Sequence, residues 1–217
     1  MTDKKLLIVG ALASVLLLVL GWLWLGRADN AATQTALGDG QDAFSQCREG
    51  VIAGGAGSIG GPFEMTDENG NRVTDADIIT KPTLIYFGFS FCPDVCPLDN
   101  SRNAEALDLL EEDGIDAQAV FVTVDPKRDT PEVMNDYTAN MHEKMIGLTG
   151  SEEDIAAMAK TWRVAYIVND DGSDDYTVSH TTQTYLSLPE AGFVEFFNRD
   201  ISAEEMAERV GCFVNAS

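Results

Sequence analysis

Two cysteines separated by three residues are the most reactive side chains in this sequence. Cys92 and Cys96 follow residues 84–89, an apolar run that predicts a buried strand. Pro93 and Pro97 follow the two cysteines, and a proline early in a helix loses no backbone hydrogen bond, so the spacing predicts a turn that enters a helix. A thiol pair at such a corner can form a structural disulfide, exchange disulfides with other molecules, or bind one soft metal ion.

The position of this pair at the start of a helix affects its chemistry. A helix beginning near Pro97 directs its positive end toward the cysteines, and we expect it to lower the pKa of both thiols. The usual redox spacing is C-x-x-C; the extra residue here permits a disulfide but also lets two sulfurs face one ion. These residues alone therefore leave the structural, redox and metal interpretations open.

The sequence contains two histidines that could add a third ligand. His142 lies at a polar helix end, and we expect it to be a surface residue. His180 lies between two strand patterns, in a loop that could meet the cysteines, although a lone histidine of this kind is more often structural. Beside two thiolates, His180 would complete a Cys₂His site that suits Cu(I), and also Cu(II) or zinc.

The N-terminus has the composition of a membrane anchor. Lys4 and Lys5 precede residues 6–25, an uncharged and mostly aliphatic stretch. A helix of that length spans about 30 Å, the thickness of a bilayer core, whereas the apolar region of a cleaved signal peptide has only about 7–15 residues. The two lysines outweigh Arg27, so we expect a single-pass protein of a bacterial inner membrane, with a cytoplasmic N-terminus and a periplasmic domain.

The strongly acidic composition limits the partners of that domain. The formal net charge is −22. Residues 1–27 hold three of the 14 basic and one of the 36 acidic side chains, so the residues beyond Arg27 carry 11 basic and 35 acidic ones, a net charge of −24. Such a surface repels nucleic acid and anionic lipid, so we expect no nucleic-acid partner. The charge favours solubility, and it could also steer basic partners or cations toward the protein.

Cysteines in an oxidising compartment are candidates for disulfides. Cys47 and Cys212 lie near the two ends of the soluble part, and compact domains often bring their ends together. We therefore expect a structural disulfide between Cys47 and Cys212. The alternatives are two unpaired thiols or an intermolecular bridge.

The order of predicted elements indicates an α/β fold. Residues 1–27 are assigned to the cytoplasmic N-terminus and anchor, 28–46 to a linker, and 47–217 to the domain. An N-terminal hairpin, alternating strands and helices, and a terminal hairpin and helix imply a sheet with a parallel part. The glycine-rich residues 50–62 lack the Lys-Ser/Thr of a phosphate-binding loop. A thioredoxin-like fold, with a central mixed sheet flanked by helices, fits this order and puts Cys92 and Cys96 at the end of a central strand.

A family resemblance rests on several blocks in a fixed order. The blocks are residues 60–63, 86–97, 124–131, 147–150 and 176–180. Together they resemble the Sco/SenC family of membrane-anchored, thioredoxin-like copper proteins, over about residues 60–197. The cysteine block and the block Asp-Pro-Lys-Arg-Asp-Thr-Pro are highly specific in combination.

The resemblance implies a metallochaperone that delivers copper to the binuclear copper site of cytochrome c oxidase. It implies one copper ion per domain, held by Cys92, Cys96 and His180. The implied partners are the oxidase copper-site subunit, a periplasmic copper donor and the inner membrane. The family usually has aspartate before the histidine, where this chain has Ser179, so the surroundings of the ligand are expected to differ.

We therefore expect a binding and transfer protein rather than an enzyme, with copper loading controlled by oxidation of Cys92 and Cys96. The alternative is a thiol–disulfide oxidoreductase, in which the same redox-active pair reduces cysteines of an oxidase subunit and His180 is not a ligand. A peroxidase is disfavoured, because no Thr-x-x-Cys and no nearby activating arginine accompany Cys92.

Overall fold

The computed structural model describes residues 43–50, 52, 55–170 and 172–217. The predicted anchor and nearly all of the predicted linker lie outside the described residues. Within the described part, none of the helices combines the length and the apolar character that crossing a bilayer requires. Apart from its first few residues, the described chain belongs to one compact unit, Gln46–Ser217.

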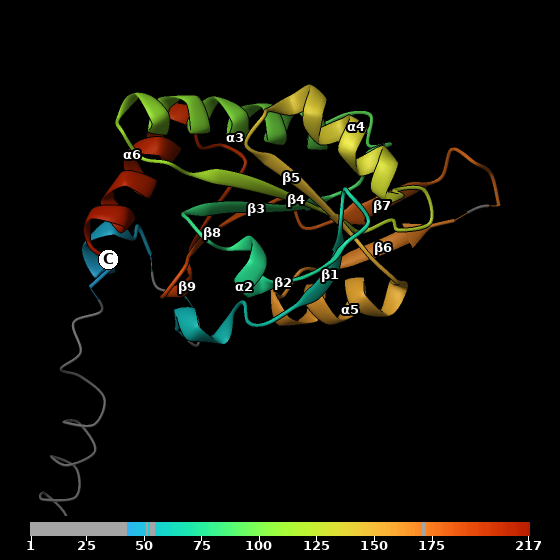
Figure 1. Cartoon of the computed structure of the whole chain (residues 1–217), viewed down its shortest axis with the longest axis horizontal. Coiled ribbons are helices and arrows are strands. Elements are labelled where there is room, and N and C mark those ends of the chain that lie inside the picture. The colour runs from blue at the N-terminus through green and yellow to red at the C-terminus, as the bar shows by residue number, and fades with distance from the viewer. Residues whose placement is uncertain (1–42, 51, 53–54, 171) are drawn as a thin grey trace, which may run out of the picture. The chain divides into compact units, whose positions relative to one another are not determined.

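A mixed seven-stranded sheet forms the centre of this unit, with the order β2-β1-β5-β4-β3-β8-β9 (Figure 1). The neighbours β3, β4 and β5 run parallel, and the remaining pairs are antiparallel. The central mixed sheet and the N-terminal hairpin β1–β2 agree with the prediction. The strands of this sheet are β1 (Glu64–Asp67), β2 (Arg72–Thr74), β3 (Thr83–Gly88), β4 (Gln118–Thr123), β5 (Met145–Thr149), β8 (Thr184–Leu188) and β9 (Gly192–Phe197).

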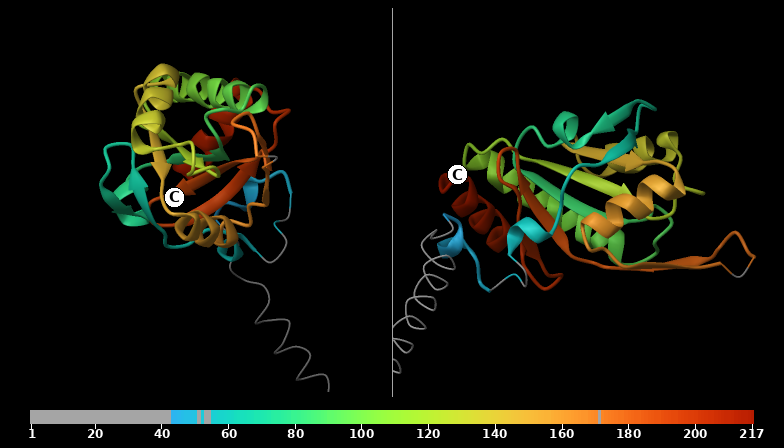
Figure 2. Two further views of the ribbon diagram at one scale, coloured as in Figure 1. Left: turned by 90° about the vertical axis from the view of Figure 1, so that its right-hand side faces the viewer. Right: turned by 90° about the horizontal axis from the view of Figure 1, so that it is seen from below.

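Helices cover both faces of the sheet. Helices α3 and α4 lie on one side and α5 lies on the other (Figures 1 and 2). Every residue of β3 and of β4 is buried, as expected for parallel strands covered on both faces. The helices are α2 (Asp75–Ile78), α3 (Val95–Glu112), α4 (Pro131–Met141), α5 (Glu152–Thr161) and α6 (Ala203–Asn215), with 3₁₀ turns at Ser45–Cys47 and Ala56–Ser58.

The starts of two helices follow from capping residues. The Thr130 hydroxyl accepts a hydrogen bond from the backbone of Val133. Ser151 and Asp154 form a reciprocal capping box at the start of α5. Helix α3 begins at Val95 instead of near Pro97. This earlier start is possible because the first four backbone N–H positions of a helix have no partner within the helix, so a proline at the third position loses nothing.

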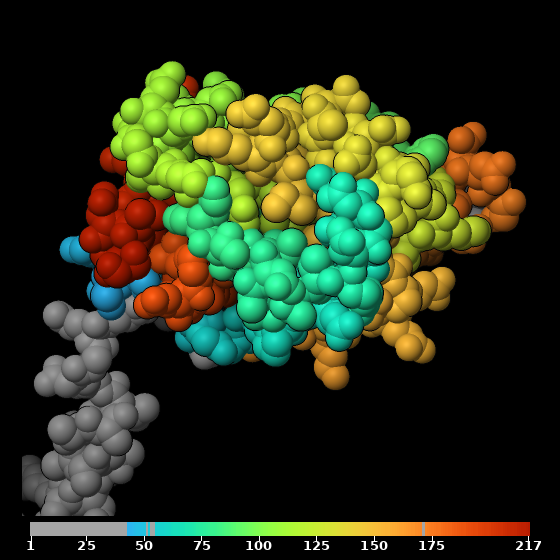
Figure 3. Space-filling model, in the orientation of Figure 1, coloured from blue at the N-terminus to red at the C-terminus, as the bar shows by residue number. Residues whose placement is uncertain are grey.

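A second, two-stranded sheet stands apart from the central one. Strands β6 (Tyr166–Asn169) and β7 (Thr177–His180) pair in antiparallel register. Their hairpin extends from one end of the domain in the ribbon views and in the surface view (Figures 2 and 3). His180, expected in a loop between two strands, is instead the last residue of β7, and the sequence does not indicate that this hairpin leaves the main sheet.

The four cysteines form two separate pairs. Cys47 and Cys212 are joined by a disulfide, with their Cα atoms 5.7 Å apart, whereas Cys92 and Cys96 carry free thiols. The disulfide links the first described turn to α6, at the end of the domain away from the β6–β7 hairpin (Figure 1).

Candidate metal centre

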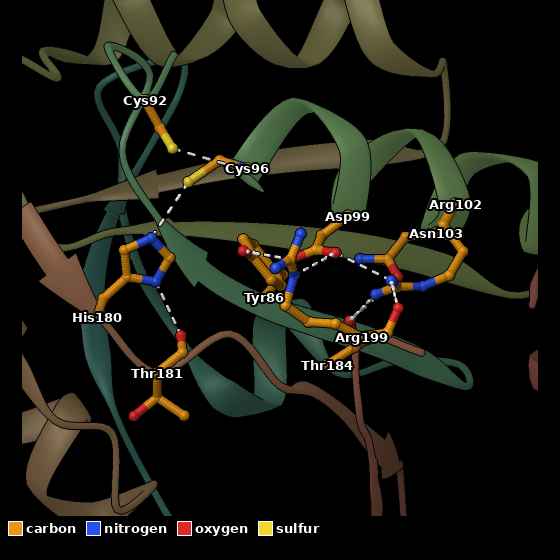
Figure 4. A network of polar contacts seen from close by, with 10 residues as sticks. All are labelled: Tyr86, Cys92, Cys96, Asp99, Arg102, Asn103, His180, Thr181, Thr184 and Arg199. Atoms are coloured by element: carbon orange, nitrogen blue, oxygen red, sulfur yellow. Dashed lines mark hydrogen bonds and ion pairs between the residues drawn. The ribbon is translucent and has the colours of Figure 1, made fainter. Parts of the chain in front are cut away.

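Three side chains from distant parts of the chain meet at the C-terminal end of β3. Cys92 lies in the turn after β3, Cys96 in the first turn of α3, and His180 at the end of β7. One ligand atom of each lies within 4.8 Å of the others. The Cys96 Sγ and His180 Nε2 atoms are 3.3 Å apart (Figure 4). The fold thus brings together the three residues that the sequence analysis singled out.

The two thiols differ in their surroundings. Cys96 is fully buried and its backbone N–H lies 3.4 Å from the Cys92 sulfur, while Cys92 is half-buried. The Cys96 sulfur packs against the backbone of Gly88, where an added Cβ would lie only 2.9 Å from it. The last residue of β3 must therefore be glycine for this sulfur to occupy its place.

The expected lowering of both thiol pKa values is wrong for Cys96. Burial raises the pKa of the Cys96 thiol, and its contact with Cys92 raises it further. The positive end of α3 does not offset the loss of solvation, because the sulfur has no water around it to stabilise a negative charge. A cation must therefore displace the proton before this sulfur can act as a ligand.

His180 is oriented as a ligand by a backbone carbonyl. Its Nδ1–H donates to the Thr181 carbonyl oxygen at 2.8 Å, which leaves the lone pair of Nε2 facing Cys96. Burial lowers the pKa of His180. The neutral imidazole, which is the form that metals bind, is thus favoured at neutral pH.

The structure explains why serine is accommodated before the histidine. Ser179 and His180 are successive residues of a strand, so their side chains point to opposite faces. Ser179 is exposed, and its hydroxyl oxygen accepts a hydrogen bond from the Asn169 side chain at 3.2 Å. The carbonyl of Thr181, rather than a carboxylate, therefore holds the imidazole.

Aromatic rings and a buried carboxylate surround the histidine. The rings of Tyr86 and Phe89 both lie edge-on to His180, with centroids 6.0 Å away. The Tyr86 hydroxyl donates to the buried Asp99 carboxylate at 2.9 Å (Figure 4). Asp99 is also ion-paired to two arginines, Arg102 at 2.9 Å and Arg199 at 3.1 Å.

No role for this buried network is predicted from the sequence. The available signal was an acidic residue, Asp99, three positions after Cys96 on a helix that faces the sheet. The other histidine lies elsewhere: His142 is half-buried and its Nε2 is 3.2 Å from Asp108.

A groove gives access to the site from solvent. Its volume is about 320 Å³, and its lining includes both Cys92 and His180. Phe89, Val95 and Val178 make much of its wall apolar. An incoming ligand can therefore reach Cys92 and His180 directly, whereas Cys96 lies behind them.

Comparison with known proteins establishes the family. The SCO1/SenC family model matches residues 53–215, which is most of the chain. This protein belongs to the SCO1/SenC family. The protein SenC of Rhodobacter capsulatus is one relative. It is 50% identical to this chain over 175 residues, which cover 81% of this chain and 79% of that protein.

Solved structures of SCO1/SenC proteins share the fold. A copper-bound crystal structure of Arabidopsis thaliana ScoI matches with a TM-score of 0.69 and 38% identity, over 72% of this chain and 99% of that one. Copper-bound Bradyrhizobium japonicum ScoI matches with a TM-score of 0.64 and 39% identity, over 70% and 98%. The predicted thioredoxin-like fold is thereby confirmed. Two thiols and an imidazole nitrogen suit copper, so Cys92, Cys96 and His180 could form a copper site.

Proposed function

We propose that this SCO1/SenC protein is a copper metallochaperone that delivers one copper ion to the binuclear copper site of cytochrome c oxidase. The observation that carries the proposal is the convergence of Cys92, Cys96 and His180, whose ligand atoms lie within 4.8 Å of one another although the last two are 84 positions apart in the sequence. The copper in related structures supports the identity of the ion.

Transfer proceeds by stepwise exchange of ligands. Cys92 and His180 line the groove, so a cysteine or histidine of the acceptor meets them first. Cys96, which is fully buried, is the last ligand to be released. The raised pKa of the Cys96 thiol assists this last step, because the sulfur takes up a proton readily once the cation leaves.

Oxidation of the thiol pair controls loading. The two sulfurs lie within reach of each other, and a Cys92–Cys96 disulfide would remove both thiolate ligands at once. Copper binding therefore requires the reduced protein.

The domain is proposed to act in the periplasm, tethered to the inner membrane by residues 1–27. The Cys47–Cys212 disulfide supports an oxidising compartment, since such bonds persist there and are rare in the cytosol. Under this proposal the copper donor and the oxidase subunit meet the domain on the outer side of that membrane.

The test is complementation of a strain that lacks the gene, grown with limiting copper. Cys92→Ser and His180→Ala should each lower cytochrome c oxidase activity, and added copper should partly restore it. His142→Ala removes the other histidine of the chain and serves as the matched control, with activity expected to equal that of the unmodified protein. Normal oxidase activity in the deletion strain at limiting copper would contradict the proposal.

The same experiment distinguishes the rival function of thiol–disulfide oxidoreductase. That activity has a structural basis in the two free thiols, of which Cys92 is the more exposed. A reductase needs both cysteines but no imidazole ligand. Full activity of His180→Ala combined with loss of activity in Cys92→Ser would therefore favour the reductase.

A further inference from the structure

The turn formed by residues 125–129, between β4 and α4, contacts both halves of the metal centre without supplying a ligand. It contains the Asp-Pro-Lys-Arg-Asp sequence of the block that, with the cysteine block, characterises the chain. The turn touches the segment that carries Cys92 on one side and the hairpin that carries His180 on the other. We refer to it as the 125–129 turn.

On the cysteine side, Asp129 holds the segment that leads into Cys92. The Asp129 carboxylate is fully buried and accepts a hydrogen bond from the Ser90 backbone N–H at 3.0 Å, and a second one from the Ser90 hydroxyl. Thr123, at the end of β4, also donates to Asp129, at 2.6 Å. Ser90 lies two residues before Cys92, so these bonds fix the start of the turn that presents the thiol.

On the hairpin side, Asp125 holds Tyr176, the residue immediately before β7. The Tyr176 hydroxyl donates to Asp125 at 2.7 Å. Arg128 donates to the other oxygen of Asp125, and its guanidinium carbon lies 3.6 Å from the centre of the Tyr176 ring. Arg128 also donates to the backbone carbonyl of Asp174 at 3.1 Å. The strand that starts after Tyr176 ends at His180.

The 125–129 turn is itself attached to the central sheet. The Thr149 hydroxyl, on β5, donates to the Asp129 carbonyl at 2.7 Å, and the Val124 N–H donates to the carbonyl of Gly88 at 2.7 Å. The β6–β7 hairpin, by contrast, forms no part of that sheet. An isolated two-stranded hairpin is only marginally stable, so its position depends on such side contacts.

We propose that the 125–129 turn sets the separation between the cysteines and the histidine. Asp125 and Arg128 act as positioning residues for His180 through Tyr176. Asp129 acts as a positioning residue for Cys92 through Ser90. The expected effect on copper binding rests on the proposed function, but the placement of His180 and Cys92 by the 125–129 turn exists in the copper-free protein.

Tyr176→Phe tests the hairpin arm, because it removes only the hydroxyl that reaches Asp125. Tyr185→Phe is the matched control: Tyr185 is also buried, and its hydroxyl forms no hydrogen bond with another described residue. Copper affinity of each reduced protein is measured by competition with a chelator. Loss of one hydrogen bond to a charged group should weaken copper binding by roughly tenfold in Tyr176→Phe and leave it unchanged in Tyr185→Phe.

A double-mutant cycle shows whether the effect passes through His180. In a His180→Ala background, Tyr176→Phe should produce no further loss of copper affinity. Ser90→Ala, which loosens the cysteine arm, should weaken binding in both backgrounds. The proposal is overturned if Tyr176→Phe binds copper like the unmodified protein, or if it weakens binding equally with and without His180, as a general loss of stability would.

A copper-free measurement separates this inference from the proposed function. In the reduced apoprotein, nuclear Overhauser contacts should join the His180 ring to the rings of Tyr86 and Phe89, and Tyr176→Phe should weaken them. If these contacts are unchanged by Tyr176→Phe, the positioning role is wrong even where copper binds. If the unmodified protein binds no copper, the proposed function is wrong. The nuclear Overhauser contacts of the His180 ring in the apoprotein then still show whether Tyr176 positions His180.

Discussion

At the scale of single residues, the main feature of the site is the tight packing around the Cys96 sulfur. The thiol of Cys96 lies between the backbone of β3 and the imidazole of His180, in a place that water does not reach. Its burial raises the pKa of the thiol, and the missing side chain of Gly88 makes room for it. A small change at position 88 should therefore disturb the metal centre although none of its three candidate ligands is replaced.

Gly88→Ala should displace the Cys96 sulfur and weaken copper binding. The added Cβ would lie 2.9 Å from that sulfur and 2.9 Å from the ring of Phe121, so the neighbours must move. Overpacking of this kind costs about 1–3 kcal/mol of stability. Chemical denaturation and copper competition measure the two effects.

Gly211→Ala is the matched control. Gly211 lies within α6, and a Cβ added there would make an ordinary 3.5 Å contact with the side chain of Ile115. Replacing glycine by alanine within a helix should stabilise the protein by about 0.5–1 kcal/mol and leave copper affinity unchanged. Unchanged stability and copper affinity in Gly88→Ala would contradict the tight packing described for Cys96.

At the scale of elements, the site depends on segments that the sequence predicts individually but does not assemble. The buried strand before Cys92 follows from an apolar run, and the helix starts at Thr130 and Ser151 follow from capping patterns. Which strands pair is decided by contacts between distant residues, so the separation of β6 and β7 from the main sheet could not be predicted.

Two helices show the limits of local patterns in the same way. Helix α2 has only four residues, too few for any apolar periodicity to appear. Helix α6 runs to Asn215, because Phe213 is buried in the core and extends the packed face, although no regular capping pattern in the sequence marks that end. Cys92, Cys96 and His180 are recognisable in the sequence as candidate ligands, but their meeting is visible only in the folded chain.

The 125–129 turn leads to a prediction about pH. Burial raises the pKa of Asp129 above its usual 3.8, although the bonds from Ser90 and Thr123 oppose the shift. The folded protein therefore holds this proton more tightly than the unfolded chain does. Between the pKa of Asp129 in the unfolded chain and its higher pKa in the folded protein, the contribution of Asp129 to the free energy of unfolding must fall as the pH rises.

Carboxyl carbon NMR across an acid titration checks this shift. Asp129 should titrate above 3.8. Asp77 provides the opposite case, because it is exposed and hydrogen bonds from Thr74 lower its pKa below the same value. A pKa of Asp129 at or below the pKa of Asp77 would show that the Asp129 carboxylate is better solvated than the structure indicates.

At the scale of the whole molecule, the stabilising disulfide and the candidate metal centre lie at different ends of the domain. The Cys47–Cys212 disulfide closes a loop with a sequence separation of 165 and ties the start of the domain to α6. The metal centre lies beside the β6–β7 hairpin, away from that helix (Figure 1). The two cysteine pairs should therefore be separable by mutation.

Replacing both Cys47 and Cys212 by serine should lower stability while leaving copper stoichiometry at the value for the unmodified protein. The chain-entropy model gives about 5 kcal/mol for a loop of this length, as an upper value. Denaturant unfolding of both proteins, with copper titration under reducing conditions, measures the two quantities. Loss of copper binding in a variant that remains folded would mean that the two ends are coupled.

X-ray absorption at the copper edge of the reduced, copper-loaded protein decides whether Cys92, Cys96 and His180 bind the ion. We expect one copper per chain with two sulfur ligands and one imidazole nitrogen. His180→Ala should lose the nitrogen and bind copper more weakly, while His142→Ala should give the spectrum of the unmodified protein. Coordination by sulfur alone in the unmodified protein, or an affinity that does not change in His180→Ala, would contradict the assignment of Cys92, Cys96 and His180 as the copper site.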